Sequence, residues 1–283
     1  MPLHRLWIMM LTVLLGSLAH GEDLTAQQII DRIKSKVGVD WSANTVDTIK
    51  AGSGAEKITG ITTTMFPTLE VLKKSVAAGN NLIICHEPTF YNHKDDLTPL
   101  EKDDVQLAKL AYIKEHKLVV FRFHDHWHRM KPDGIMTGVA EALGWQGRAR
   151  KGEQSVFDIE TTTVGELAKL MKEKLKCSAV RVVGDPKMPC AKIALSPGAG
   201  ATLAQIAALQ RDDVDVLACG ETREWETVEY TRDAIATGRK KALIVLGHSP
   251  SEEPGMATCA KWLEGFMSLP VKFIPCGDPF WAP

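Results

Sequence analysis

Apolar residues in this chain recur with two alternating spacings, which predict a succession of helices and buried strands. Thr25 begins a helical pattern, with Gln28 three residues later as in a capping box, and Gly38 ends it. Short, continuous apolar runs follow, and these are typical of strands that are buried on both faces. In the first half of the chain we expect strands over residues 57–65, 81–85 and 118–123, and further helices over residues 67–79, 105–116 and 134–143.

The same alternation begins again after the basic, glycine-containing stretch 147–152. Here the pattern predicts strands over residues 155–159, 180–183, 192–195, 214–219, 242–246 and 271–274, and helices over residues 164–175, 203–209, 225–236 and 256–266. Strands that alternate with helices favour an α/β fold with mostly parallel, covered sheets. We therefore expect two α/β domains of similar size, an N-terminal domain over residues 22–150 and a C-terminal domain over residues 151–283.

The first 21 residues have the pattern of a secretory signal peptide. Arg5 precedes an apolar run over residues 6–15, and small residues follow at 17 and 19, where a signal peptidase prefers them. The run is short for a membrane span, although an uncleaved anchor is the alternative interpretation. We expect cleavage near residue 21, a secreted or periplasmic protein, and no stable membrane span after cleavage.

Composition excludes several classes of protein. Hydrophobic residues make up 45% of the 283 residues and charged residues 24%, which is ordinary for a soluble globular domain. The formal net charge is −1, so no general basic field exists to bind nucleic acid, and we expect none as a partner. The six cysteines are widely spaced without a CxxC pair, which leaves both a disulfide and free buried thiols open.

Histidine is concentrated in three clusters, each directly after a predicted strand. Two of the nine histidines lie in the signal segment, and six of the other seven fall in the clusters. The carboxyl ends of strands are where sites form in open α/β sheets. The clusters are residues 85–88 with His93 nearby, residues 124–128, and His248 with Glu252.

Imidazoles and carboxylates together form the ligand set of zinc, iron or manganese. The clusters offer too many donors for one tetrahedral ion, and they suit two ions roughly 3.5–4 Å apart that lower the pKa of a bound water. Each cluster alone has an alternative interpretation. The first and second can be polar loops, and the third a pair at the start of a helix. Because all three share one edge of the sheet, we favour a metal site.

Several motifs in this order resemble the NIF-three-like dinuclear metal centre family, also known as GTP cyclohydrolase 1 type 2. The resemblance covers nearly all of the chain after the signal segment. It implies two interlinked three-layer α/β/α domains, a site between them, and a homohexamer. The motifs are Asn-Leu-Ile-Ile-Cys-His-Glu-Pro at 81–88, the segment 134–144, Val-Gly-Asp-Pro at 183–186, Leu-Ser-Pro-Gly-Ala-Gly at 195–200, Cys-Gly-Glu at 219–221 and Gly-His-Ser-Pro-Ser-Glu at 247–252.

The resemblance also implies the metal ligands, residue by residue. Glu87 stands where the family usually has a second histidine, and His128 stands where it usually has an aspartate. The two exchanges leave the totals of histidine and carboxylate ligands unchanged, which favours retained metal binding. The implied ligands are His86, Glu87, His124, His128, His248 and Glu252, with Asp125 as another possible donor of the second cluster.

We therefore expect a metal-dependent hydrolase with two divalent ions, either Zn, Fe or Mn, in which a metal-bound hydroxide attacks a small-molecule substrate. That substrate is expected to be nucleotide-like or phosphorylated, and Glu87 or Asp125 to act as general base. A non-catalytic metal-binding scaffold is the alternative. A third interpretation rests on His124, His126 and His128, whose spacing is similar to part of the metallo-β-lactamase motif.

Overall fold

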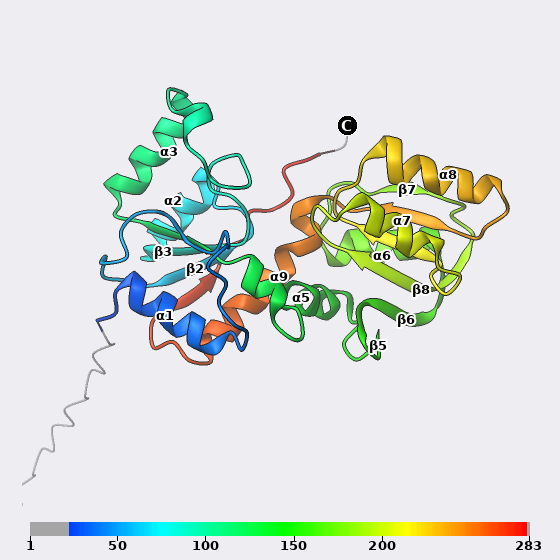
Figure 1. Cartoon of the computed structure of the whole chain (residues 1–283), viewed down its shortest axis with the longest axis horizontal. Coiled ribbons are helices and arrows are strands. Elements are labelled where there is room, and N and C mark those ends of the chain that lie inside the picture. The colour runs from blue at the N-terminus through cyan, green and yellow to red at the C-terminus, as the bar shows by residue number, and fades with distance from the viewer. Residues whose placement is uncertain (1–22, 282–283) are drawn as a thin grey trace, which may run out of the picture.

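The computed structural model describes residues 23–281 as two lobes joined by a pair of central helices (Figure 1). The predicted signal peptide, residues 1–21, lies outside the described residues. Among residues 23–281, none of the helices combines the length and the apolar character that a membrane crossing requires. The helices are α1 (Ala26–Lys36), α2 (Leu69–Ala77), α3 (Asp104–Glu115), α4 (Asp125–Arg129), α5 (Gly134–Leu143), α6 (Val164–Lys174), α7 (Thr202–Gln210), α8 (Glu229–Ala236) and α9 (His248–Glu264).

The first lobe is built on a five-stranded sheet in the order β1-β4-β3-β2-β11. Its strands pair in parallel, except for β1 with β4. Alternate side chains of β3 point to opposite faces, so Ile83 packs with Leu72 of α2 and Ile113 of α3, whereas Ile84 packs in the core formed with α1 and α9. The strands are β1 (Ile49–Ala51), β2 (Ile61–Thr64), β3 (Leu82–Cys85), β4 (Val119–Arg122) and β11 (Val271–Phe273).

The second lobe holds a six-stranded sheet in the order β5-β6-β8-β9-β10-β7. Strands β8, β9 and β10 are parallel neighbours, and the other pairs are antiparallel. Leu209 of α7 packs on one face, and Leu167 and Met171 of α6 on the other. The strands are β5 (Ala149–Arg150), β6 (Glu153–Thr163), β7 (Arg181–Val183), β8 (Pro189–Ser196), β9 (Val216–Cys219) and β10 (Ala242–Val245).

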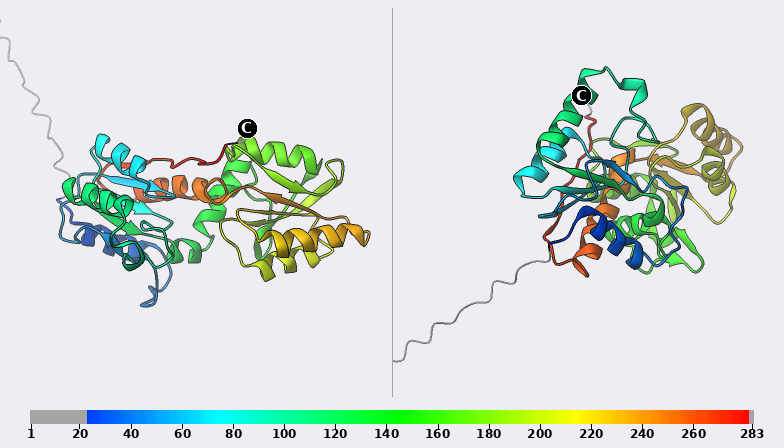
Figure 2. Two further views of the ribbon diagram at one scale, coloured as in Figure 1. Left: turned by 90° about the horizontal axis from the view of Figure 1, so that it is seen from above. Right: turned by 60° about the vertical axis from the view of Figure 1, so that its left-hand side comes forward.

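The chain returns to the first lobe after β10. Helix α9 packs on α5 and on β2, where the Thr63 hydroxyl donates to the Met256 carbonyl at 2.9 Å, and β11 then joins the first sheet beside β2. Figure 2 shows α9 running between the lobes. The segment after β11 crosses back to the second lobe, where Asp278 accepts hydrogen bonds from the backbone and hydroxyl of Ser178. The two lobes are thus interlinked.

The predicted α/β class with two domains is confirmed, and two of its details need correction. The sheet of the second lobe is mixed, because a hairpin adds β5 and β6 and an edge strand adds β7 in antiparallel pairing. The range 151–283 predicted for the second domain does not follow the sheets, because α9 and β11 pack in the first lobe. The six cysteines are all free thiols, and five of them are buried.

The contact between α5 and α9 depends on two glycines at the crossing. A Cβ atom added to Gly138 would lie 2.5 Å from the carbonyl oxygen of Pro254 and 2.6 Å from the Cα atom of Gly255. Real Cβ atoms do not approach backbone atoms so closely, so the two helix backbones are in direct contact. Small residues permit this approach, which fixes the position of α9 relative to the first sheet.

We expect Gly138→Ala to lower the free energy of unfolding by about 2 kcal/mol, because the added methyl group meets the backbone of α9. Alanine raises intrinsic helix propensity by up to about 1 kcal/mol, so a loss reports the steric contact. Chemical denaturation measures the change. The control is Glu141→Ala on the exposed part of α5, where only a surface ion pair at 3.7 Å is lost. A Gly138→Ala protein as stable as wild type would contradict the close crossing.

Candidate metal centre

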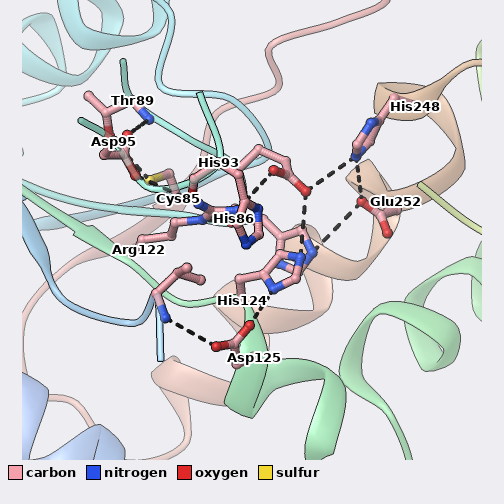
Figure 3. Close-up of polar contacts among 12 residues, drawn as sticks. Cys85, His86, Thr89, His93, Asp95, Arg122, His124, Asp125, His248 and Glu252 are labelled. Carbon is pink, nitrogen blue, oxygen red and sulfur yellow. Dashed lines mark hydrogen bonds and ion pairs between the residues drawn. The ribbon is translucent and has the colours of Figure 1, made fainter. Parts of the chain in front are cut away.

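Four imidazoles and two carboxylates converge where the first sheet meets the N-terminus of α9. His86 and Glu87 directly follow β3, and His124 follows β4. His128 lies one turn further in α4, while α9 contributes His248 and Glu252 from its first turns. Figure 3 shows His86, His124, His248 and Glu252 turned toward one another. Because β3 and β4 are parallel neighbours, their carboxyl ends bring the first two sequence clusters to the same edge.

The six side chains lie within a few ångströms of one another through their terminal atoms. The Nε2 atom of His86 lies 3.2 Å from Nε2 of His128 and 3.7 Å from Oε2 of Glu252. The Nε2 atom of His248 lies 3.2 Å from Oε2 of Glu252 and 3.2 Å from Oε1 of Glu87. That Glu87 oxygen is 3.6 Å from Nε2 of His124. Two groups of donors therefore share Glu252, one around His86 and His128, the other around His248 and Glu87.

The second ring nitrogen of each of these imidazoles, Nδ1, faces away from the centre and has its own partner. Nδ1 of His124 lies 2.9 Å from Asp125, and Nδ1 of His128 lies 3.0 Å from Asp133. The remaining two lie near oxygen acceptors as well: Nδ1 of His248 is 2.7 Å from Glu221, and Nδ1 of His86 is 3.3 Å from the Phe123 carbonyl. Metal-binding histidines usually use the second nitrogen in this way, because such a bond fixes the tautomer and orients the ring. Here it directs all four Nε2 atoms inward.

Burial and charge shift the titration of the central groups. Burial lowers the pKa of His86 well below its ordinary value, and the neighbouring rings of His124 and His128 add to the effect. Burial alone would lower the pKa of His248 as well, but hydrogen bonds and charge interactions with Glu252 and Glu87 raise it to about 11. One imidazole is thus held neutral and another is favoured as a cation, as expected for a site that concentrates negative charge around His248.

Glu87 is held by a buried arginine. Arg122 is fully buried, and its Nη2 atom donates to Oε2 of Glu87 at 3.1 Å. The same guanidinium donates to the carbonyl oxygens of His86 and His93. Burial alone would raise the pKa of Glu87, but contacts with His248, His124 and Arg122 hold it below its usual value. Arg122 thus engages the outer oxygen and leaves Oε1 toward the histidines.

Glu252 is the carboxylate at the middle of the site, and its surroundings fit a metal ion. Its side chain is 4% exposed, and its buried Oε2 atom faces two imidazoles, Nε2 of His248 at 3.2 Å and Nε2 of His86 at 3.7 Å, without a well-aligned hydrogen bond. A Cβ atom added to Gly198 would lie 2.3 Å from Oε1, so the turn after β8 passes directly over the carboxylate. A buried carboxylate oxygen without a donor is costly unless a cation satisfies it. Two overlapping sets of three residues also have the spacing of metal ligands: His86 with His124 and His128, and His86 with Glu87 and Glu252.

A cavity of about 1100 Å³ opens beside the cluster, between the two lobes. Glu87 and His248 line its inner end, and Phe66 packs edge-on against the His248 ring at 5.6 Å between centroids. His93 also lines this cavity, exposed, with its ring 6.5 Å from that of His124. The cavity has room for a small molecule whose reactive group would meet the cluster.

The remaining residues of the 124–128 cluster lie outside the centre. Asp125 accepts hydrogen bonds from the Thr45 hydroxyl and the Val46 backbone, besides its contact with His124. Burial would raise the pKa of Asp125, but these bonds lower it to about 2. With its oxygens occupied and its charge stabilised, Asp125 orients His124. The geometry gives no support to the general-base role predicted for it.

His126 points away from the centre. Its fully buried ring stacks on Trp41 at 3.7 Å, its Nδ1 atom lies 2.6 Å from Asp47, and its Nε2 atom accepts a hydrogen bond from the Ser42 backbone. Asp47 also accepts the backbone N–H groups of residues 124–126. Because α4 is helical, residues two apart point in different directions, and the arrangement needed for the metallo-β-lactamase interpretation does not form.

Three supporting residues were missed by the sequence interpretation: Asp47, Arg122 and Asp133. Of the three, Asp133 could have been found from the sequence, because an aspartate before an apolar helix is a typical N-cap. In the structure it caps α5 by accepting hydrogen bonds from the backbone of Ile135 and Met136. Nothing in the sequence places Asp47 near the histidines, and although Arg122 is two residues before His124, nothing indicates that its side chain reaches Glu87. Both reach the site through tertiary contacts, and Asp47 is more than 70 residues before the segment 124–126 that it binds.

Comparison with known proteins identifies the family of this chain. A family model described as Duf34/NIF3 (NGG1p interacting factor 3) matches residues 19–278. A GTP cyclohydrolase 1 type 2 homolog of Clostridium acetobutylicum is 25% identical over an alignment of 228 residues, which covers 77% of this chain and 81% of the relative. The resemblance predicted from the sequence motifs is confirmed.

Solved structures of similar fold cover nearly the whole chain. A hypothetical protein of Staphylococcus aureus superimposes with a TM-score of 0.74 at 17% identity, covering 93% of this chain and all of the other. A Bacillus cereus protein related to NIF3 gives a TM-score of 0.72 at 15% identity, with 92% and 99% coverage. At these identities the likeness concerns the fold, and it supports the interlinked two-lobe arrangement.

We expect His126→Ala to lower the free energy of unfolding by about 3 kcal/mol while the metal content stays that of wild type. The substitution breaks a buried contact with Asp47 and removes a stacked ring, but no atom directed at the centre. Thermal or chemical unfolding measures the first effect, and elemental mass spectrometry of the purified protein measures the second. Loss of metal from His126→Ala at unchanged stability would place His126 among the ligands instead.

Proposed function

The chain belongs to the Duf34/NIF3 family, and on that premise we propose that it is a hydrolase whose cluster holds two divalent metal ions, Zn, Fe or Mn. The observation that carries the proposal is the convergence of four Nε2 atoms on two buried carboxylates, with every outer nitrogen near an oxygen acceptor. A hydrogen-bond network without metal would not need all four rings oriented alike. The proposed ligands are His86, Glu87, His124, His128, His248 and Glu252.

Two divalent ions held by these residues would lower the pKa of a bound water and polarise a phosphoryl or carbonyl oxygen. The chain's own residues supply the rest. Glu252 would be shared between the two donor groups, because its two oxygens face His128 and His248. Glu87 keeps its Oε1 atom toward the cavity, while Arg122 holds the other oxygen. We propose Oε1 of Glu87 as the atom that accepts a proton when it does not ligate.

The cavity supports a hydrolase over a metal-binding scaffold. A scaffold needs no cavity beside its metals, whereas this cavity of about 1100 Å³ has Glu87 and His248 in its wall. The Clostridium relative is named after a GTP cyclohydrolase, which points to nucleotide-like or phosphorylated small molecules as the substrate class. A secreted protein would not meet intracellular GTP, so we propose another member of that class.

The proposal is tested by the metal content and the activity of the same samples. We expect about two first-row metals per chain in wild type purified without chelator, and clear losses in His86→Ala and His248→Ala, since each removes an inward Nε2 donor. Hydrolysis of aryl phosphate mono- and diesters and of nucleotides is then measured. We expect turnover to fall at least about 100-fold in both variants. The control is His116→Ala, whose ring packs on Tyr112 outside the cluster.

The outcomes separate the hypotheses. Metal that is bound by wild type and lost in the variants, without hydrolysis of any substrate class, would favour the scaffold. A folded wild type that holds no metal, even after reconstitution with Zn, Fe or Mn, would contradict the metal centre itself.

We also propose that the protein is exported through its N-terminal signal and assembles as a homohexamer. The hexamer is an expectation from the family resemblance, whereas export is an expectation from the N-terminal sequence pattern. N-terminal sequencing of protein from the periplasm or medium is expected to begin near residue 22. Light scattering coupled to size exclusion is expected to give about six times the mass of one chain. A full-length N-terminus in the membrane fraction would contradict export, and a monomeric mass would contradict the hexamer.

A further inference from the structure

A buried lysine lines the cavity that adjoins the proposed metal centre. Lys109 of α3 is 4% exposed, and it lines the same cavity as Glu87 and His248. Its Nζ atom donates one hydrogen bond, to the Thr89 carbonyl at 2.7 Å. An ammonium group has three N–H donors, so two are left for other partners.

No carboxylate of residues 23–281 forms an ion pair with Lys109. The acidic group that acts on it, Asp95, is engaged elsewhere, since its Oδ2 atom lies 3.5 Å from Lys50 and 3.6 Å from Arg122. The other Asp95 oxygen accepts the backbone N–H groups of Thr89 and Phe90. Burial lowers the pKa of Lys109 to about 8, which reflects the cost of an ammonium without an adjacent counter-charge.

The Lys109 ammonium lies against two aromatic rings, whereas the carboxylates that line the same cavity are engaged with other partners. The Tyr91 ring lies 5.3 Å from Nζ of Lys109, and the Phe90 ring 5.9 Å. Tyr91 is 56% exposed and adopts a φ of 54°, a left-handed conformation that a bulky residue rarely takes. The ring is thus held at the cavity by a strained turn instead of being buried in the core, which leaves a face for a ligand.

The second buried lysine of the chain provides a comparison. Lys241 is also 4% exposed, but its Nζ atom donates to two carbonyls, those of Arg211 and Val214, in the second lobe. It does not line the cavity. Lys241 therefore has a structural role, whereas Lys109 keeps donors available at the wall of a cavity.

We infer that Lys109 binds the oxyanion group, phosphate or carboxylate, of the small molecule that occupies this cavity, so that the rest of that molecule lies between Tyr91 and the metal centre. The inference rests on the proposed function for the identity of the occupant as substrate. An anion would satisfy both free donors and would supply the missing counter-charge. It would also fix one end of the molecule and present the other to Glu87 and His248.

The test uses equilibrium dialysis of the metal-loaded protein with radiolabelled inorganic phosphate and, separately, acetate. We expect Lys109→Met to bind at least one of the two anions about tenfold or more weakly than wild type, since a charge-assisted hydrogen bond is lost. The matched control Lys241→Met is expected to bind as wild type does. Any anion held by the metals contributes equally to all three proteins, so the ratio of affinities reports Lys109. The anion whose binding falls identifies the group recognised.

Equal affinities of Lys109→Met and wild type for both anions would overturn the inference. A second measurement uses the wild-type protein, in case Lys109→Met does not fold. In this measurement the lysines are acetylated chemically, and phosphate or acetate is expected to slow the acetylation of Lys109 in proportion to its occupancy. The acetylation rate of Lys241 is expected to stay the same with and without the anion. Unchanged acetylation of Lys109 would equally overturn it. Neither readout needs turnover. A protein that binds the anion through Lys109 but hydrolyses nothing would therefore contradict the proposed function and leave this inference intact.

Discussion

The contact between α5 and α9 is the constraint on which the cluster of histidines and glutamates depends. Four of the six inward side chains come from the carboxyl edge of the first sheet, whereas His248 and Glu252 begin α9. Gly138 and Gly255 let the backbones of α5 and α9 touch, and the Thr63 hydroxyl ties α9 to β2. A shift of α9 by one side-chain layer would move Glu252 away from the histidines. Helix packing thus decides whether the three sequence clusters form one site.

The centre concentrates groups that are costly to bury alone. Glu87 and Glu252 are both almost fully buried, and isolated carboxylates in such surroundings lose several kcal/mol of hydration. Arg122 compensates Glu87 on one side, and His248, favoured as a cation, compensates both. The buried Oε2 atom of Glu252 still lacks a well-aligned hydrogen bond, although Nε2 of His248 lies 3.2 Å away. Metal cations would balance this charge, which is why the electrostatics favour the proposed centre over a network of hydrogen bonds alone.

The exchange that the family resemblance implies at positions 87 and 128 fits the neighbours of each side chain. A carboxylate at 87 has the guanidinium of Arg122 beside it, and an imidazole at 128 has Asp133 to orient it. Each exchanged residue thus has a partner of the right charge. The cavity side of the centre carries a further positive group, Lys109, that no carboxylate of the described residues pairs with. The site therefore combines a compensated interior with a wall suited to an anionic ligand.

The sequence by itself determined the α/β class, most of the buried strands, and the residues that would form the centre. Continuous apolar runs identify strands such as β3 and β9, because both of their faces are covered. The density of histidine after strand ends identifies the site, because the ends of parallel strands meet at one edge. Spacing could not show that His126 points into the core, since that depends on the short helix α4.

Only the tertiary structure decided the partners of these residues. The return of β11 to the first sheet, the antiparallel edges of the second sheet, and the placing of Asp47, Arg122 and Lys109 depend on contacts between segments far apart in the chain. Local patterns record which face of an element is buried, but they do not record what covers it. For that physical reason the residues of the candidate site could be predicted from the sequence, whereas the groups that orient and compensate them could not.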